Sequence, residues 1–596
     1  MPTWRQKHER LNKFLALPVF SSDAVSSVAY GPEEVLLGLM AAGAVAWTVS
    51  LPVGLCIAIL IAIVSMSYRQ TIFAYPQGGG SYIVSRENLG TYPGLVAASA
   101  ILTDYVLTVA VSVAAGVAAV VSAYPGLAGD RTMLGVVAVG MVALANLRGL
   151  RESGALFAPP TYVFILSLGV LVFVGTFRLL RGEPVSFVNP PSQYVPILHQ
   201  LSTFMVLKAF ASGCSAMTGL EAIADGTPAF RSPESKNAAA TMSYMAAILI
   251  TLVLGITYLA HIYRVFPTEH ETVVSQIARA IFGKHWFYFL IQYATAAILI
   301  LAANTAFQDF PRLSSILARD RFAPRQLANI GDRLVFSNGI LLLGLMAALL
   351  IVVFRGDTHA LIPLYAVGVF VAFTLSQASM FVRLRRLKPP GWKIRSFVSG
   401  FGSMVTGTVA MVITYSKFTS GAWIVCIIIP VLVLVFYKIH QHYLQLAEQL
   451  RVVDGRFVEP PPVKSTAIVL VGMIHKGVLP ALEYARTLSH DCRALYVEID
   501  PNDTALLRER WEQYGLGVPL VVLESPFRSL IGPVVKYLEE VKKERPDHVV
   551  TVVLPEFVPK RWWHKVLHNQ SGMFLKLALM TRRGVVFTNV RYYLER

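Results

Sequence analysis

The stretch SVAYGPE at residues 27–33 has a second copy, SAMTGLE, at residues 215–221. Both copies read serine, two residues, a hydroxyl side chain, glycine, one residue and glutamate. Each copy lies in an apolar segment rich in small residues, 20–37 and 209–226, and such a segment, interrupted by glycine and carrying carboxylates, predicts a broken transmembrane helix. Two broken helices at corresponding positions are typical of inverted-repeat transporters, whose substrate site lies where the breaks meet near the bilayer midplane.

The composition of the chain also predicts a polytopic membrane protein. Of the 596 residues, 55% are hydrophobic and 15% are charged. Apolar runs of about 20 residues, the length that crosses a bilayer as a helix, recur as far as about residue 440. The four cysteines are scattered without disulfide or metal-ligand spacing. We therefore expect a transporter and not a soluble enzyme.

Hydropathy predicts about twelve spans in the first three quarters of the chain. They lie near residues 15–42, 47–73, 93–122, 132–147, 157–180, 202–229, 238–263, 285–307, 336–354, 360–382, 398–416 and 421–440. Lysine and arginine, which give a formal net charge of +17, fall mainly in alternate short loops between these spans. The positive-inside rule then places both termini in the cytoplasm, and it explains the charge without a nucleic acid polymer as partner.

A polar, proline-rich linker, residues 445–464, separates the transmembrane domain, 1–444, from a C-terminal domain, 465–596. In this last domain, short apolar runs alternate with helical stretches. We expect buried parallel strands at 466–472, 493–499, 519–523 and 548–554, and helices at 480–489, 505–514 and 531–543. The alternation predicts a doubly wound α/β domain in the cytoplasm.

Six carboxylates lie within or beside the predicted spans: Asp23, Glu33, Glu34, Asp104, Glu221 and Asp225. An ionised carboxylate at the bilayer midplane costs about 2.5–3.5 kcal/mol, so these groups need cations, protons or water. Glu34 and Asp225 are expected near a helix end and water. Because Lys208 is the one obvious basic residue within the spans, the remaining carboxylates predict a bound alkali cation, a titrating proton, or both.

Spacing pairs two of these carboxylates with hydroxyl groups. Asp104 and Thr108 are four residues apart, and Thr218 and Glu221 are three apart, so each pair shares a helix face. Carboxylates, hydroxyls and the carbonyls released by a broken helix are hard oxygen ligands that suit a dehydrated group I cation. The cysteines and histidines of the spans offer no comparable site for copper or zinc.

The hydroxyl side chains also have a purely structural interpretation. Thr108 and Thr218 can each bond to a carbonyl one turn back along the helix, and Tyr30 and Tyr365 can be packing or interface residues. The buried charge of the carboxylates is harder to explain by structure alone. The cost of burying charge favours three residues as ligands: Asp23, Asp104 and Glu221.

The segment SSDAVSSVAYG at residues 21–31 with Glu33 and Glu34, the turn YPQGGGSY at 75–82 and TGLEA at 218–222 resemble a known family. They are similar to bacterial members of the amino acid/polyamine/organocation (APC) superfamily, above all to KUP-type potassium importers of the KimA kind. The resemblance covers nearly the whole chain. It implies twelve spans in a five-plus-five inverted repeat (the LeuT/APC fold), a cytoplasmic tail similar to universal stress proteins, and a place in the bacterial inner membrane.

The resemblance further implies proton-coupled potassium uptake by alternating access, with K⁺ and H⁺ as substrates and no cofactor for transport. The cation ligands that it implies are Asp23, Tyr30, Asp104, Thr108, Thr218, Glu221 and Tyr365. Of these, Tyr365 rests on the resemblance alone. We expect a carboxylate to exchange the proton during the cycle, Asp23 or Glu221 in the first place, with Glu33 as a further candidate.

Two other functions stay open. An amino acid or polyamine permease has the same fold, but its amino acid members resemble one another in a first break with free amides for the substrate carboxylate, where this chain has Pro32 and neighbouring acids. A polyamine would tolerate the acids, so competition between potassium and organic amines separates the two. The third interpretation is a sensor with a vestigial membrane part, which would have little reason to keep buried carboxylates.

The tail differs from stress-protein domains that bind ATP. These resemble one another in a glycine-rich phosphate loop, whereas this chain has HNQS at 568–571 in the corresponding place. Related transporters imply regulation by cyclic di-AMP or another adenine nucleotide, and the basic aromatic cluster RWWHK at 561–565 can stack a base or rest on a membrane or a second subunit. A homodimer formed through the tails is the alternative role for this domain.

Overall fold

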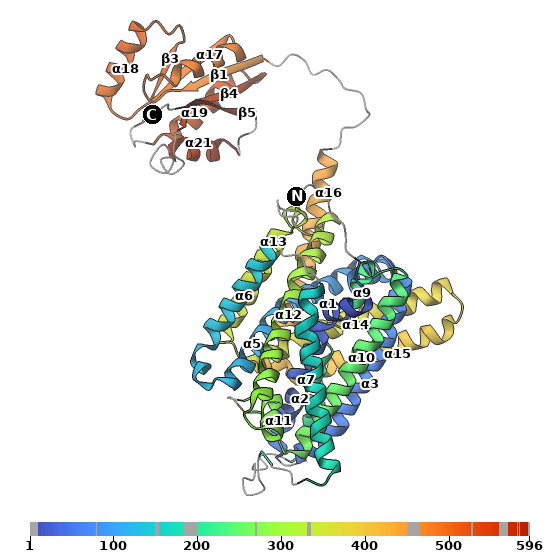
Figure 1. The fold of residues 1–596 in the computed structure, drawn as a ribbon. Coiled ribbons are helices and arrows are strands. Elements are labelled where there is room, and N and C mark those ends of the chain that lie inside the picture. Colours follow the sequence, from blue (N-terminus) through green and yellow to red (C-terminus); the bar gives the residue numbers. More distant parts are fainter. Residues whose placement is uncertain are drawn as a thin grey trace. The chain divides into compact units, whose positions relative to one another are not determined.

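The computed structural model describes residues 10–43, 45–78, 80–148, 154–183, 187–188, 200–268, 271–329, 335–450, 464–525, 529–558, 570–580, 582 and 584–593. The chain divides into two compact units, Met1–Arg451 and Val452–Arg596, which we call the membrane unit and the tail unit (Figure 1).

Long apolar helices make up most of the membrane unit, as the hydropathy predicts. Within the described ranges, nine helices are long and apolar enough to cross a membrane. Their helical bounds are α3 (Val45–Ala74), α5 (Thr91–Ala123), α6 (Arg131–Leu147), α7 (Gly154–Leu180), α10 (Glu234–Ile262), α12 (Trp286–Arg319), α14 (Thr358–Leu387), α15 (Trp392–Lys417) and α16 (Ala422–Gln449). Shorter helices are α4 (Ser81–Leu89), α11 (Val273–Phe282) and α13 (Ser337–Val353).

The breaks expected at the two copies of the repeated stretch are present. In the first, α1 (Lys13–Ser26) passes through a 3₁₀ turn, Ser27–Ala29, into α2 (Gly31–Leu39). In the second, α8 (Thr203–Gly213) is followed by a 3₁₀ turn, Cys214–Met217, and by the short α9 (Ala222–Asp225). Each piece is shorter than the roughly 20 residues that span a bilayer. Nine spans by length and apolarity therefore fall short of the predicted twelve, which stays a prediction.

Each break contains a residue with a special backbone: Pro32, which lacks an amide hydrogen, in the first, and Gly219, which has a positive φ, in the second. Pro32 occupies the first turn of α2, where a missing amide hydrogen is tolerated. Gly219 has φ of +75°, a conformation that favours glycine. The broken helices lie among long ones: α5 is mostly buried and contacts α12 and α14, and α10 packs along α3 (Figure 1).

The tail unit contains a parallel five-stranded sheet of order β3-β2-β1-β4-β5. The strands are β1 (Lys464–Leu470), β2 (Asp491–Glu498), β3 (Leu520–Glu524), β4 (His548–Val558) and β5 (Val585–Tyr593). Helices α17 (Val478–Leu488) and α18 (Pro501–Gln513) cover one face, while α19 (Ile531–Glu544) and α21 (Gln570–Met580) cover the other. The predicted doubly wound α/β arrangement is confirmed, with β5 as an additional strand.

Candidate functional site

The two helix breaks pack directly against each other. Ser27 Oγ donates a hydrogen bond to the backbone carbonyl of Ala216 at 2.8 Å. A Cβ atom on Gly31 would lie 2.6 Å from the Cβ of Ala216, and one on Gly219 would lie 2.6 Å from Oδ2 of Asp23. Small residues therefore allow the two breaks, and the carboxylate of Asp23, to come this close.

The first break contributes Asp23 and Tyr30, which are both buried. Oδ1 of Asp23 and the hydroxyl of Tyr30 have no hydrogen-bond partner among the described residues. The Tyr30 hydroxyl faces the side chains of Thr218 and Tyr365, but neither contact has hydrogen-bond geometry. The Asp23 and Tyr30 oxygens therefore lie in one region, and each can still bind a cation or accept a hydrogen bond.

The neighbouring helices α5 and α14 add a second group of oxygens. Thr108 Oγ1 donates to the hydroxyl of Tyr365 at 3.2 Å, so Thr108 is not limited to a carbonyl of its own helix. Gly368 brings α14 close to this part of α5, because a Cβ there would lie 3.0 Å from the carbonyl oxygen of Ala100. Asp104, one turn before Thr108, is buried, and its Oδ1 has no partner in the described ranges.

The second break supplies Thr218 and Glu221. Thr218 Oγ1 donates to the carbonyl of Ser215 at 3.3 Å, which is the structural role that threonines often take in a helix. Glu221 is 4% exposed, its Oε2 has no partner among the residues described, and its carboxyl group interacts electrostatically with Asp23 and Asp104.

The structure thus brings all seven predicted ligands together from four elements. They are carboxylates and hydroxyls, the donor set that suits a hard cation of low charge. Within the described part of the chain, no group of three or more His, Cys, Asp and Glu converges closely enough to hold a metal ion by itself. The cation would therefore need the hydroxyl and carbonyl oxygens as well as the carboxylates.

Glu33, the further proton candidate, belongs to a different group. Its carboxylate accepts from the backbone N–H of Val273 at 3.4 Å and lies 3.8 Å from Nε2 of His359. Glu34 lies 2.7 Å from Nδ1 of His359 and 4.0 Å from Nζ of Lys417. Glu34 is 2% exposed, so the expectation that it approaches water is wrong, because a buried cation and a histidine replace the solvent.

A cavity of about 450 Å³ lies beside the second break. Asp225 and Asp309 line it, together with Tyr105 and Arg312, and both carboxylates interact electrostatically with Glu221. Asp309 is a residue that the sequence analysis missed, because the predicted eighth span ended at 307 whereas α12 continues to Arg319. A carboxylate within an apolar helix was the available signal.

In the tail unit, the order of the sheet places a change of direction between β1 and β4, where ligands of doubly wound domains bind. The cluster at 561–565 and residues 568 and 569 lie outside the described residues, and residues 570 and 571 are described as helix only.

Comparisons with known proteins agree with this arrangement. Residues 19–445 match the family model "Amino acid permease", and residues 463–592 match "KimA potassium transporter C-terminal domain". The chain is 43% identical over 591 residues to the Potassium transporter KimA of Bacillus subtilis (strain 168), and the match covers 99% of this chain and 96% of that protein. The structure has two broken helices with buried carboxylates, followed by this C-terminal domain. The chain therefore belongs to the KimA-type potassium transporter family in the APC superfamily.

Proposed function

We propose that this protein imports potassium, coupled to protons, by alternating access. The observation that carries the proposal is the set of buried carboxylate oxygens on Asp23 and Glu221 at the helix breaks and on Asp104 of α5, which have no partner among the described residues. The chain is also 43% identical to a protein named as a potassium transporter.

In the proposed mechanism the cation exchanges its water shell for oxygens from four elements. Asp23 and Tyr30 come from the first break, Thr218 and Glu221 from the second, and Asp104, Thr108 and Tyr365 from α5 and α14. Because a buried carboxylate without a counter-charge is costly, each one favours either the cation or a proton. Asp23 and Glu221 lie at the breaks, so a change in the packing of the breaks alters which of the two they hold.

We propose twelve spans in a five-plus-five inverted repeat, with both termini in the cytoplasm of a bacterium whose inner membrane holds the protein. The repeated stretch, the two breaks and the concentration of basic residues in alternate loops support it. On this topology the cavity with Asp225 and Asp309 lies on the cytoplasmic side of the site and offers an exit path.

We propose two roles for the tail unit: binding of an adenine nucleotide such as cyclic di-AMP, and formation of a homodimer. The parallel sheet with its switch point between β1 and β4 supports a nucleotide site and a likeness to universal stress proteins.

The test is flux through the purified chain in liposomes. Rubidium or potassium entry is followed together with internal pH, with and without an imposed proton gradient. We expect cation entry that an inward proton gradient accelerates. Spermidine and amino acids are added as competitors and as substrates, and their uptake without cation flux would replace the proposal by an organic-amine permease.

A further inference from the structure

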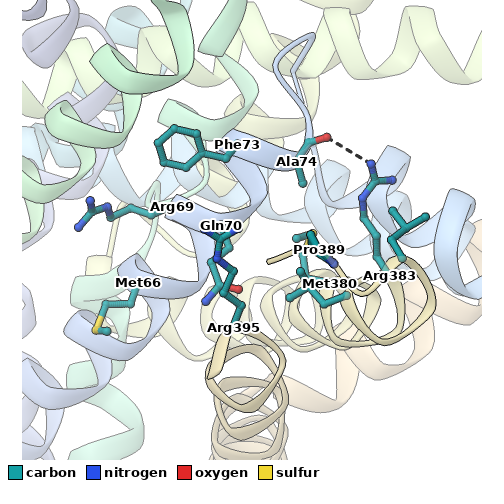
Figure 2. A pocket seen from close by; sticks show the side chains of 11 residues that line it. Met66, Arg69, Gln70, Phe73, Ala74, Met380, Arg383, Pro389 and Arg395 are labelled. Carbon is teal, nitrogen blue, oxygen red and sulfur yellow. Dashed lines mark hydrogen bonds between the residues drawn. The ribbon is translucent and has the colours of Figure 1, made fainter. Parts of the chain in front are cut away.

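A cavity of about 450 Å³ lies between α3, α14 and the start of α15, away from the helix breaks. Figure 2 shows side chains from these helices around it. Its lining contains three arginines, Arg69, Arg383 and Arg395, and one further polar side chain, Gln70. The ends of the three helices that form the cavity carry many of the basic residues that predict the topology. This inference rests on the proposed function, whose topology puts the cavity at the cytoplasmic surface of the membrane.

The three arginines differ in the hydrogen bonds that their guanidinium groups form. Arg383 donates to the Tyr75 hydroxyl at 3.1 Å and to the Ala74 carbonyl at 3.5 Å, and the second bond is drawn in Figure 2. The side chains of Arg69 and Arg395 are exposed and have neither a hydrogen bond nor an ion pair with any residue that the structure describes. No acidic residue is among the described residues that line the cavity. Three arginines from three helices thus line one cavity, and no described lining residue carries a negative charge.

The rest of the lining is apolar. Exposed Met66, Phe73 and Leu387 line the cavity with Met380 and Pro389. The first two turns of α15, which contain Arg395, also expose Ile394 and Phe397. A ligand for this cavity therefore needs an anionic group for the guanidinium groups and an apolar part for the surface beside them.

We propose that this cavity binds an anionic phospholipid of the cytoplasmic leaflet. Arginine binds phosphate by two parallel hydrogen bonds, and basic cavities between membrane helices on the cytoplasmic side are suited to anionic head groups. An arginine that only anchors a helix end extends its own charge to water, whereas here arginines from three helices line one cavity with apolar walls. The acyl chains would lie along the exposed apolar residues of α3 and α15.

The test uses the full chain, purified in a neutral detergent and titrated with dioleoyl phosphatidylglycerol or dioleoyl phosphatidylcholine. Native mass spectrometry measures bound lipid, and thermal unfolding measures its effect. The variant is Arg69→Gln combined with Arg395→Gln, because these exposed side chains have no hydrogen bond or ion pair with a described residue whose loss would disturb folding. We expect at least a fivefold loss of phosphatidylglycerol affinity and little change for phosphatidylcholine.

The matched control combines Arg319→Gln with Arg321→Gln, which removes the same two charges from the exposed end of α12 and the turn after it and should bind phosphatidylglycerol like the parent protein. An unchanged affinity in the double variant would overturn the proposal, as would an equal loss in the control, which would indicate general charge attraction. Inorganic phosphate and glycerol 3-phosphate are added as competitors. Displacement of the lipid by either one at equal concentration would overturn the lipid as occupant and assign the cavity to a soluble anion.

Discussion

Asp104 is buried on α5 with one carboxylate oxygen that no described residue satisfies. Asp104→Asn keeps the size of the side chain and removes the charge that the cation needs. Since an interaction with a charged group contributes about 1.5–3 kcal/mol, we expect potassium uptake to fall about ten- to a hundredfold with normal membrane insertion. Uptake into liposomes measures this. Asp130→Asn, the same change at an exposed residue, is the control, and full transport by Asp104→Asn would refute the assignment.

Gly219 has two reasons to be glycine: its φ of +75° and its contact with Asp23. A methyl group there would lie 2.6 Å from Oδ2 of Asp23 and 2.9 Å from the amide nitrogen of Ala24. We expect Gly219→Ala to destabilise the protein by about 1–3 kcal/mol and to abolish most transport. Thermal unfolding and uptake check it against Gly129→Ala, where a Cβ meets nothing within 4 Å. Equal behaviour of the two variants would contradict the close packing.

The energetic cost of burying a carboxylate, and the spacing between carboxylates and hydroxyl residues, allowed part of the site to be predicted residue by residue. Asp23, Asp104 and Glu221 stand out because a buried carboxylate is expensive wherever it lies in a span. Tyr365 did not, because a tyrosine in a helix has many structural explanations and its bond to Thr108 joins residues far apart in the chain. His359 was missed for the same reason: its partners are on α2.

At the scale of the elements, Glu33, Glu34, His359 and Lys417 hold α2 against the ends of α14 and α15. His359→Leu removes the donor and leaves Glu34 buried with, among the described residues, only the 4.0 Å contact to Lys417. We expect a loss of about 1–3 kcal/mol in unfolding free energy, because a buried carboxyl group loses its close hydrogen-bond partner. Thermal unfolding in detergent measures the loss. His285→Leu at an exposed position is the control, and equal stability of both variants would show that the cluster contributes little.

Helix breaks were easier to predict than helix ends. A glycine or proline within an apolar run identifies a break directly, whereas the ends of α12 and α16 extend beyond the hydrophobic residues because polar side chains continue a helix outside the membrane. Strand β5 was missed for a related reason. It is an edge strand whose residues are partly exposed, so Thr588, Asn589 and Arg591 interrupt the apolar run that revealed the other four.

At the scale of the whole molecule, the tail unit has a stabilising centre of its own at Asp491. Its carboxylate accepts from Thr466 at 3.0 Å, Arg493 at 3.1 Å and Arg545 at 2.5 Å. Burial opposes the charge, but the hydrogen bonds and the charges of both arginines outweigh it and hold the pKa of Asp491 below its usual value. A lowered pKa adds stability above the ordinary aspartate pKa of about 3.9, and this stability is lost as the pH falls.

We expect Asp491→Asn to lower the stability of the tail unit by about 1–2 kcal/mol at pH 7 and by less at pH 4. Hydrogen exchange of β1 and β2 in the full chain, expressed as protection factors, measures this. Asp547→Asn removes an exposed partner of Lys464 at 3.6 Å and serves as control, since such pairs contribute little. A difference between parent and Asp491→Asn that grows on acidification would have the wrong sign for this account.

The contact between Gly31 and Ala216 also limits how the family can diversify. The two residues occupy different copies of the repeated stretch, yet a methyl group at 31 has no room unless the one at 216 is removed. Neither copy is therefore free to drift: a substitution in one is tolerated only on a genetic background that already carries the compensating change in the other. The two positions should therefore be inherited together, and related chains should exchange glycine and alanine between them without carrying alanine at both.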